Sequence, residues 1–142
     1  MAEITADAYT LLKKHIVENW TRVILFDDKD NNIVTIDSTD SRFSWIHATK
    51  QMTLGYDSVG NPMKEDVPDS QTLKLEIVLT GSDSDVSLDT TFAKIELNEI
   101  TGSSYENPSD KVVSTETFTN FTISKDGDKL TVTHEIEVPQ VK

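Results

Sequence analysis

Near its end the sequence reads FTNFTISKDGDKLTVTHEIEV, residues 118–138, and its pattern is clearest there. Successive side chains of a β-strand point to opposite faces of the sheet. One face of the second half of this segment would carry Leu130, Val132, His134, Ile136 and Val138, and the opposite face polar residues. This alternation predicts a half-buried strand. A second alternating run, residues 118–124, precedes it, and the Asp-Gly pair between the two runs is typical of a tight turn, so we expect a β-hairpin.

The same period of two recurs through the rest of the chain. Alternating or β-branched apolar residues mark six further segments, residues 22–26, 33–36, 43–47, 52–56, 73–79 and 93–97. Turn-forming residues separate these segments, and no helical pattern lies between them. The chain is therefore predicted to be mainly β, with an antiparallel β-sandwich of about eight strands over residues 21–142. Residues 57–70 and 102–110 are predicted to be long surface loops, with a short strand beginning at Val112-Val113.

Residues 5–20 carry the helical pattern of the chain. Apolar side chains or histidine recur there at spacings of three and four residues, a spacing that puts them on one helix face: Ala8, Leu11, Leu12, His15, Ile16 and Trp20. The opposite face, with Lys13, Lys14 and Glu18, is expected to lie in water. We therefore divide the chain into an N-terminal amphipathic α-helix, residues 1–20, and the sandwich domain. The apolar face of the helix can pack either on the sheet or on a neighbouring subunit, and the sequence leaves both open.

The composition and net charge of the chain argue against some classes of binding partner. The 142 residues include 25 acidic and 13 basic side chains, for a formal net charge of −12, and no cysteine. Such a charge repels nucleic acid and anionic membrane, and it permits a divalent cation or a basic protein surface as partner. The N-terminal residues lack the basic and apolar regions of a secretory signal, so we expect a soluble protein that is not secreted by that route.

Two acidic loops are candidates for calcium. Asp28, Asp30 and Asn32 match alternate ligand positions of a calcium-binding loop, but Ile33 stands where such a loop needs glycine, so a polar turn is the favoured interpretation. Asp83 and Asp85 offer carboxylates in a second loop, where an acidic chain has carboxylates in any case. No cofactor is expected.

Neither the histidines nor the glycines predict an active site. His15, His47 and His134 each lie on an apolar face and show no metal-binding spacing, so each is expected to be a hydrogen-bonded core residue. The chain lacks a nucleophile-elbow motif and a phosphate-binding glycine loop, and we expect no enzyme activity. Aromatic side chains beside polar segments could stack on sugar rings, and Trp45, Tyr56 and Tyr105 are the candidates.

Several segments together resemble small all-β structural proteins of tailed bacteriophages. They read GSDSD at 81–85, TFAKIEL at 91–97, TFTNFTI at 117–123 and LTVTHEIEVP at 130–139. The resemblance implies a virion structural protein of the tail, baseplate or fibre-attachment type, assembled in the host cytoplasm. It would bind other virion proteins or copies of itself as an oligomer, using the helix or an exposed strand edge. The alternative is a carbohydrate-binding β-sandwich or adhesion module with acidic, calcium-binding loops.

Overall fold

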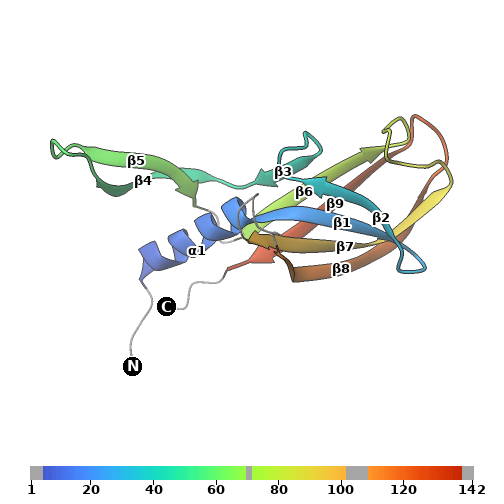
Figure 1. Ribbon diagram of the computed structural model, residues 1–142, viewed down its shortest axis with the longest axis horizontal. Helices are drawn as coiled ribbons and strands as arrows, with labels where there is room; N and C mark the ends of the chain where they lie inside the picture. The colour runs from blue at the N-terminus through green and yellow to red at the C-terminus, as the bar shows by residue number, and fades with distance from the viewer. Residues whose placement is uncertain (1–4, 70–71, 102–108, 139–142) are drawn as a thin grey trace, which may run out of the picture.

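A computed structural model describes residues 5–69, 72–101 and 109–138 of the chain (Figure 1). Within these residues the fold is mainly β, with one helix at the N-terminal side, α1 (Ala6–Asn19). Nine strands follow: β1 (Trp20–Asp27), β2 (Asn32–Asp37), β3 (Phe43–Ile46), β4 (Thr49–Tyr56), β5 (Pro62–Pro68), β6 (Thr72–Thr80), β7 (Thr90–Thr101), β8 (Ser109–Ile123) and β9 (Lys129–Glu137). No helix in the described ranges is long and apolar enough to cross a membrane.

The strands form two main sheets and a separate hairpin. The first sheet has the order β2-β1-β7-β8 and the second has the order β3-β6-β9, while β4 pairs, among the described strands, with β5 alone. All of these pairings are antiparallel. The predicted mainly β, antiparallel sandwich with an N-terminal helix is thus confirmed.

One apolar core lies between the two sheets. The second sheet contributes Leu75, Ile77 and Leu79 of β6, which alternate with partly exposed residues. The first sheet faces them with a matching set of fully buried side chains, Val23, Leu25, Ile36, Phe92, Ile95 and Leu97. Each fully buried aliphatic side chain stabilises the fold by about 1.5–3 kcal/mol relative to an exposed one. The period of two in the sequence therefore reflects burial of one face of each sheet.

The predicted hairpin at residues 118–138 is wrong. β8 pairs with β7 and β9 pairs with β6, so the turn between β8 and β9 carries the chain from one sheet to the other. Both flanking residues, Ile123 and Leu130, point into the shared core. A hairpin and a crossing between facing sheets bury the same alternate residues, so the alternation does not distinguish them.

A close approach between two loops shows how this crossing is held. The Asp128 carboxylate accepts hydrogen bonds from the backbone N–H groups of Ser124 and Lys125, at 2.9 and 3.0 Å. The Gly81 N–H donates to the Asp128 carbonyl at 3.0 Å. A Cβ at Gly81 would lie 2.0 Å from the Lys125 carbonyl oxygen, so only glycine fits there.

The segment predicted as a long loop, residues 57–70, instead contains β5. This strand pairs with β4 along its length, and the pair projects away from the sandwich (Figure 1). Most of β5 is exposed on both faces, so its residues show no apolar alternation that would have marked a strand. The short strand expected at Val112-Val113 is likewise part of the much longer β8.

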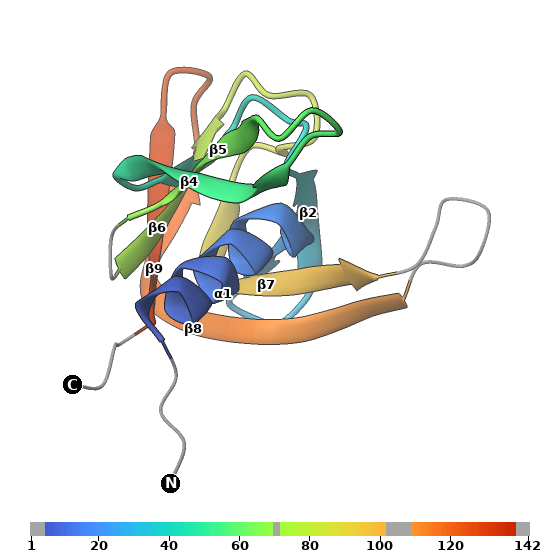
Figure 2. The same cartoon turned by 90° about the vertical axis from the view of Figure 1, so that its left-hand side faces the viewer.

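Helix α1 lies across one end of the sandwich, beneath β4 and β5 (Figure 2). The Thr5 side chain caps its start by accepting a hydrogen bond from the Ala8 N–H at 3.1 Å. Its buried residues are Thr10, Lys13 and Ile16, so the prediction that Lys13 lies in water is wrong, whereas Ile16 of the predicted apolar face is buried. Leu11 and Leu12 remain 45% and 47% exposed.

Core packing should dominate the stability of the sandwich. We expect Leu75→Ala to lower the free energy of unfolding by about 2–5 kcal/mol, since it removes a fully buried side chain between the sheets. Leu88→Ala, at an exposed position, should change it by less than about 0.5 kcal/mol. Urea denaturation followed by tryptophan fluorescence measures both. Equal losses in the two variants would contradict the assigned core.

Candidate functional site

The β4–β5 hairpin, residues 49–68, forms an arm with a rigid tip. At the tip the Asp57 carboxylate accepts hydrogen bonds from the N–H groups of Val59 and Asn61, at 3.0 and 2.9 Å. These bonds, led by the one from Asn61, lower the pKa of Asp57. Gly60 has a φ of 87° and completes the turn. The tip is therefore held in one conformation, with the Val59 side chain on its outside.

A second turn of the same kind provides an internal comparison. Between β1 and β2, the Asp27 carboxylate accepts hydrogen bonds from the N–H groups of Lys29 and Asn31, at 2.9 and 2.8 Å. Lys29 thus holds the position that Val59 holds in the arm. Lysine suits a turn that faces water, whereas Val59 leaves 78% of an apolar side chain exposed.

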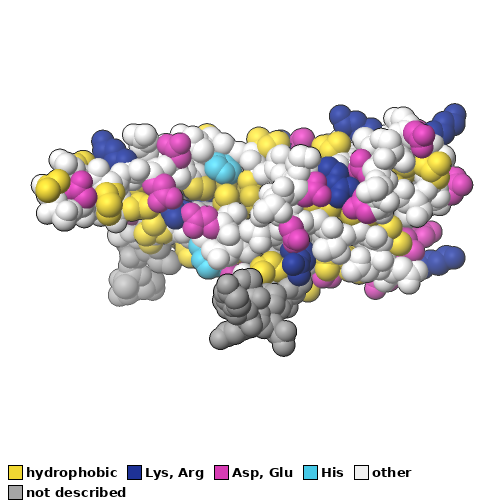
Figure 3. Space-filling view, turned by 45° about the horizontal axis from the view of Figure 1, so that its top comes forward, with side chains coloured by type: hydrophobic (Ala, Val, Ile, Leu, Met, Phe, Trp, Pro, Cys, Tyr) yellow, Lys and Arg dark blue, Asp and Glu magenta, His cyan; other side chains and the backbone are white. Residues whose placement is uncertain are grey.

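The arm and α1 carry most of the large apolar side chains exposed to solvent. Six of the ten such side chains among the described residues belong to these two elements: Leu11, Leu12, Leu54, Tyr56, Val59 and Met63. We call this set the arm–helix surface. Figure 3 shows hydrophobic side chains along the arm, at the left of the view, mixed with charged ones. Apolar side chains gathered on a projecting element are typical of a surface that binds another protein.

The inner end of the arm is anchored and its outer end is free. Val67 near the end of β5 is fully buried, and Lys14 of α1 lies 3.8 Å from the Glu65 carboxylate. At the outer end Tyr56 and Met63 are 69% and 51% exposed. The arm is thus fixed to the body at one end and presents its tip to solvent at the other.

A groove of about 390 Å³ lies between β8 and β9. Its apolar lining comes from Phe118, Phe121, Leu130 and Val132, and of the residues that the structure describes Glu116 is the one charged residue that lines it. β8 is the last strand of its sheet, and β9 is the last strand of the other. The groove therefore runs along two strand edges that have no pairing partner among the described residues.

A polar bridge joins these two edges beside the groove. His134 of β9 is 3% exposed, with Nε2 at 2.7 Å from the Ser114 hydroxyl and Nδ1 at 3.3 Å from the Glu116 carboxylate. The order serine, histidine, carboxylate resembles a catalytic triad. Ser114 is half-buried and does not line the groove, however. We interpret the bridge as a link between the sheets.

The three histidines lie in different environments. His134 is a hydrogen-bonded core residue, as expected. The His15 side chain is 57% exposed and lies 2.7 Å from the Glu99 carboxylate of β7. His47 is half-buried, and its Nδ1 lies 3.1 Å from the neighbouring carbonyl of Ala48. The prediction of three core histidines is therefore wrong for His15.

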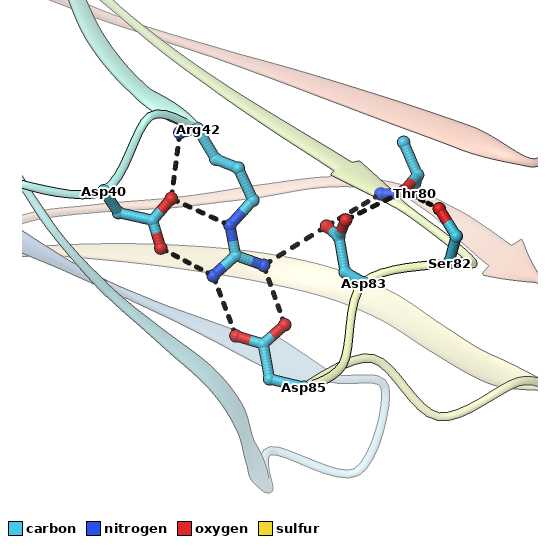
Figure 4. A network of polar contacts seen from close by, with 6 residues as sticks. All are labelled: Asp40, Arg42, Thr80, Ser82, Asp83 and Asp85. Carbon is cyan, nitrogen blue, oxygen red and sulfur yellow. Dashed lines mark hydrogen bonds and ion pairs between the residues drawn. The ribbon is translucent and has the colours of Figure 1, made fainter.

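The acidic loop predicted as a calcium candidate is bound to an arginine (Figure 4). The Arg42 guanidinium donates hydrogen bonds to Asp40 at 2.7 and 3.0 Å, to Asp85 at 2.7 and 2.8 Å, and to Asp83 at 3.2 Å. Asp83 also accepts hydrogen bonds from the Thr80 N–H and hydroxyl, at 3.1 and 2.9 Å. One cation thus ties the β2–β3 loop to the β6–β7 loop.

These contacts shift the pKa values of the groups involved. Hydrogen bonds from Arg42 lower the pKa of Asp40. Burial acts to raise the pKa of Asp83, but hydrogen bonds from Thr80 and Arg42 outweigh burial, so its pKa is also lowered. Hydrogen bonds to Asp85 and Asp40 raise the pKa of Arg42. Asp40, Asp83 and Arg42 are therefore ionised across the neutral range.

In the described part of the chain, the acidic side chains predicted as calcium ligands do not form a metal-binding group. Asp83 and Asp85 both point at Arg42, which already supplies a positive charge. Within the described ranges, no group of three or more acidic or histidine side chains is arranged to hold a metal ion. In the other candidate loop Asp30 pairs with Lys94 of β7. That loop forms the polar turn between β1 and β2 that the sequence favoured.

The predicted aromatic and helix residues lie in separate places. Trp45 stands edge-on to Phe43, with ring centroids 6.2 Å apart, in the second sheet, whereas Tyr56 lies at the outer end of the arm. Tyr105 falls outside the described residues. Ile16 is buried and Trp20 packs on the core. Of the predicted assembly-helix residues, Leu11, Leu12 and His15 are exposed.

Comparison of the chain with protein-family models, with curated proteins and with solved structures found no match. The sites to be explained are thus the arm–helix surface, the groove and the Arg42 cluster. Sequence reasoning missed Arg42, Val59 and the groove. The shared spacing of Asp57 and Asn61 with Asp27 and Asn31 is the sequence signal that would have revealed the arm's turn.

The Arg42 cluster should contribute stability that depends on pH. Because the folded pKa values of Asp40 and Asp83 are lowered, their contribution is present above the ordinary value of 3.8 and is lost as the pH falls through the lowered values. We expect Arg42→Leu to cost about 1–3 kcal/mol of unfolding free energy at pH 7, with the difference shrinking below about pH 4. Denaturant titrations at several pH values measure this.

The exposed ion pair between Lys50 and Asp69, at 3.5 Å, provides the control. Lys50→Leu should change the unfolding free energy by less than about 1 kcal/mol at any pH, since solvent screens such a pair. A loss in Arg42→Leu that is independent of pH would contradict an electrostatic role for the cluster.

Proposed function

We propose that the protein is a structural component of a tailed-bacteriophage virion and works by protein–protein assembly. The observation that supports this most strongly is the arm, which projects from the sandwich and carries exposed apolar side chains at a rigid tip. The resemblance of the sequence to tailed-phage structural proteins is the reason for proposing a virion as the assembly. In this proposal the arm–helix surface is the docking element.

The energetics of the arm favour a binding role. A two-stranded hairpin is marginally stable in water unless it packs against something else. Only the inner end of this arm is anchored, through Val67 and the contact of Glu65 with Lys14. Burying Tyr56, Val59 and Met63 against a partner would gain about 1.5–3 kcal/mol for each fully buried aliphatic side chain. Such a gain offsets part of the entropy lost on association.

The charge distribution also permits copies of the chain to associate. Residues 49–68 contain two lysines and three acidic side chains, a net charge of −1 in a chain of −12. The arm is thus nearly neutral, so it can approach another acidic protein with little repulsion. Exposed lysines and acids along it also limit nonspecific aggregation.

Assembly is tested by light scattering over a range of protein concentrations. We expect the wild-type chain to form a defined oligomer and the double variant Val59→Ser, Met63→Ser to be monomeric, because the substitutions remove apolar contact area at exposed positions. Lys29→Ser, at the equivalent position of the β1–β2 turn, should leave the oligomer unchanged. Circular dichroism should be the same for all three proteins. A wild-type chain that stays monomeric at every concentration would contradict the proposal.

Placement in a virion needs a separate measurement. Antibodies against the chain should label purified phage particles whose genome encodes it, in immunogold electron microscopy. Label found only on host material, with none on intact particles, would exclude a virion component and leave the assembly proposal to stand alone.

A further inference from the structure

We infer that the arm of one copy docks in the groove between β8 and β9 of a second copy, in a head-to-tail contact. This inference rests on the proposed assembly function and names its partner surface. It joins the apolar, rigid tip around Val59 to an apolar hollow bounded by strand edges. In Figure 1 the arm extends away from β8 and β9, so the second copy supplies the groove.

The groove is suited to an extended segment. β8 bonds to β7 on one side only, and the backbone N–H and C=O groups of an unpaired strand edge bind an added strand. Residues 117–123 of β8 read TFTNFTI and contain no charge, proline or glycine, whereas edge strands usually carry such residues to prevent pairing. Phe118 is half-buried and Phe121 is 37% exposed, so the groove offers apolar surface beside the free edge.

Charge complementarity favours a second copy as the occupant. Glu116 is the one charged residue lining the groove, and its carboxylate approaches only His134 among the described residues. Lys64, next to Met63 on the arm, is exposed and makes no ion pair with any described residue. Docking the arm with its apolar tip in the groove would bring this free cation to the carboxylate at the groove's rim.

The two surfaces differ in shape. The arm projects (Figure 1) and carries Val59 at its tip, whereas the groove is a hollow lined by residues of β8 and β9. A contact between arms would instead leave both grooves and both β8 edges unpaired. Because arm and groove are different surfaces, the head-to-tail contact repeats from copy to copy and generates a ring or a filament.

The absence of cysteine from the chain allows a direct test by disulfide cross-linking. We would make two exposed single-cysteine variants, Val59→Cys in the arm and Thr119→Cys in the groove. Mixed and oxidised, they should form a covalent dimer that neither forms alone, and the double variant should give a ladder of higher oligomers. Lys29→Cys in place of Val59→Cys should form no dimer with Thr119→Cys.

Three outcomes overturn the inference while the wild-type chain still assembles. Dimers of Val59→Cys alone would mean that arms pair with arms, and dimers of Thr119→Cys alone would mean that β8 edges pair with each other. An oligomer that gives no cross-link in the mixture would place the contact elsewhere. A monomeric wild-type chain overturns the proposed function itself, so its mass is measured first.

A mixing experiment checks the same contact without cross-links. The arm variant Val59→Ser, Met63→Ser and the groove variant Thr119→Arg should each be monomeric, because each lacks one half of the contact. Their mixture should form a dimer through the one intact pair of surfaces, with a mass twice that of the monomer. A mixture that stays monomeric would overturn the head-to-tail arrangement, since a symmetric contact cannot be restored in this way.

Discussion

Burial of one face of each sheet against the other is the constraint on which the rest of the structure depends. Leu75 and Ile77 of β6 meet Leu25 and Ile95 of the facing sheet in one core. Three connections, β2–β3, β6–β7 and β8–β9, pass from one sheet to the other around this core. Elements that the core cannot accommodate are left outside it. The arm is the clearest of these, since most of its side chains lie in water on both faces.

The polar interactions among the described residues hold the crossings between the sheets. Arg42 ties the β2–β3 loop to the β6–β7 loop through three aspartates, and His134 joins the edges of β8 and β9. Asp128 closes the β8–β9 turn. Each of these groups has its partners within the chain. Among the described residues, the surfaces left without partners include exposed apolar side chains and strand edges, which are features typical of protein-binding surfaces.

The sequence predicted the strands that carry apolar alternation, including the exposed β4, and missed β5, which carries none. Alternation located β6, β7 and β9, because packing requires it. It could not show that Ile123 and Leu130 belong to different sheets, since both point into one core. β5 escaped detection because it is solvated on both sides. On α1, apolar spacing put Leu11, Leu12 and Ile16 on one face, and of these only Ile16 is buried, while Lys13, which was expected to lie in water, is buried as well. Tertiary packing overrode the helical pattern there.

Hydrogen exchange measured at low and high protein concentration tests the account most directly. If copies join arm to groove, backbone amides in residues 49–68 and 115–123 should gain protection together as the concentration rises. Amides of β2, an edge strand outside the contact, should not change. Protection that rises in β2, or in neither segment, would contradict an assembly built on the arm and the β8 edge.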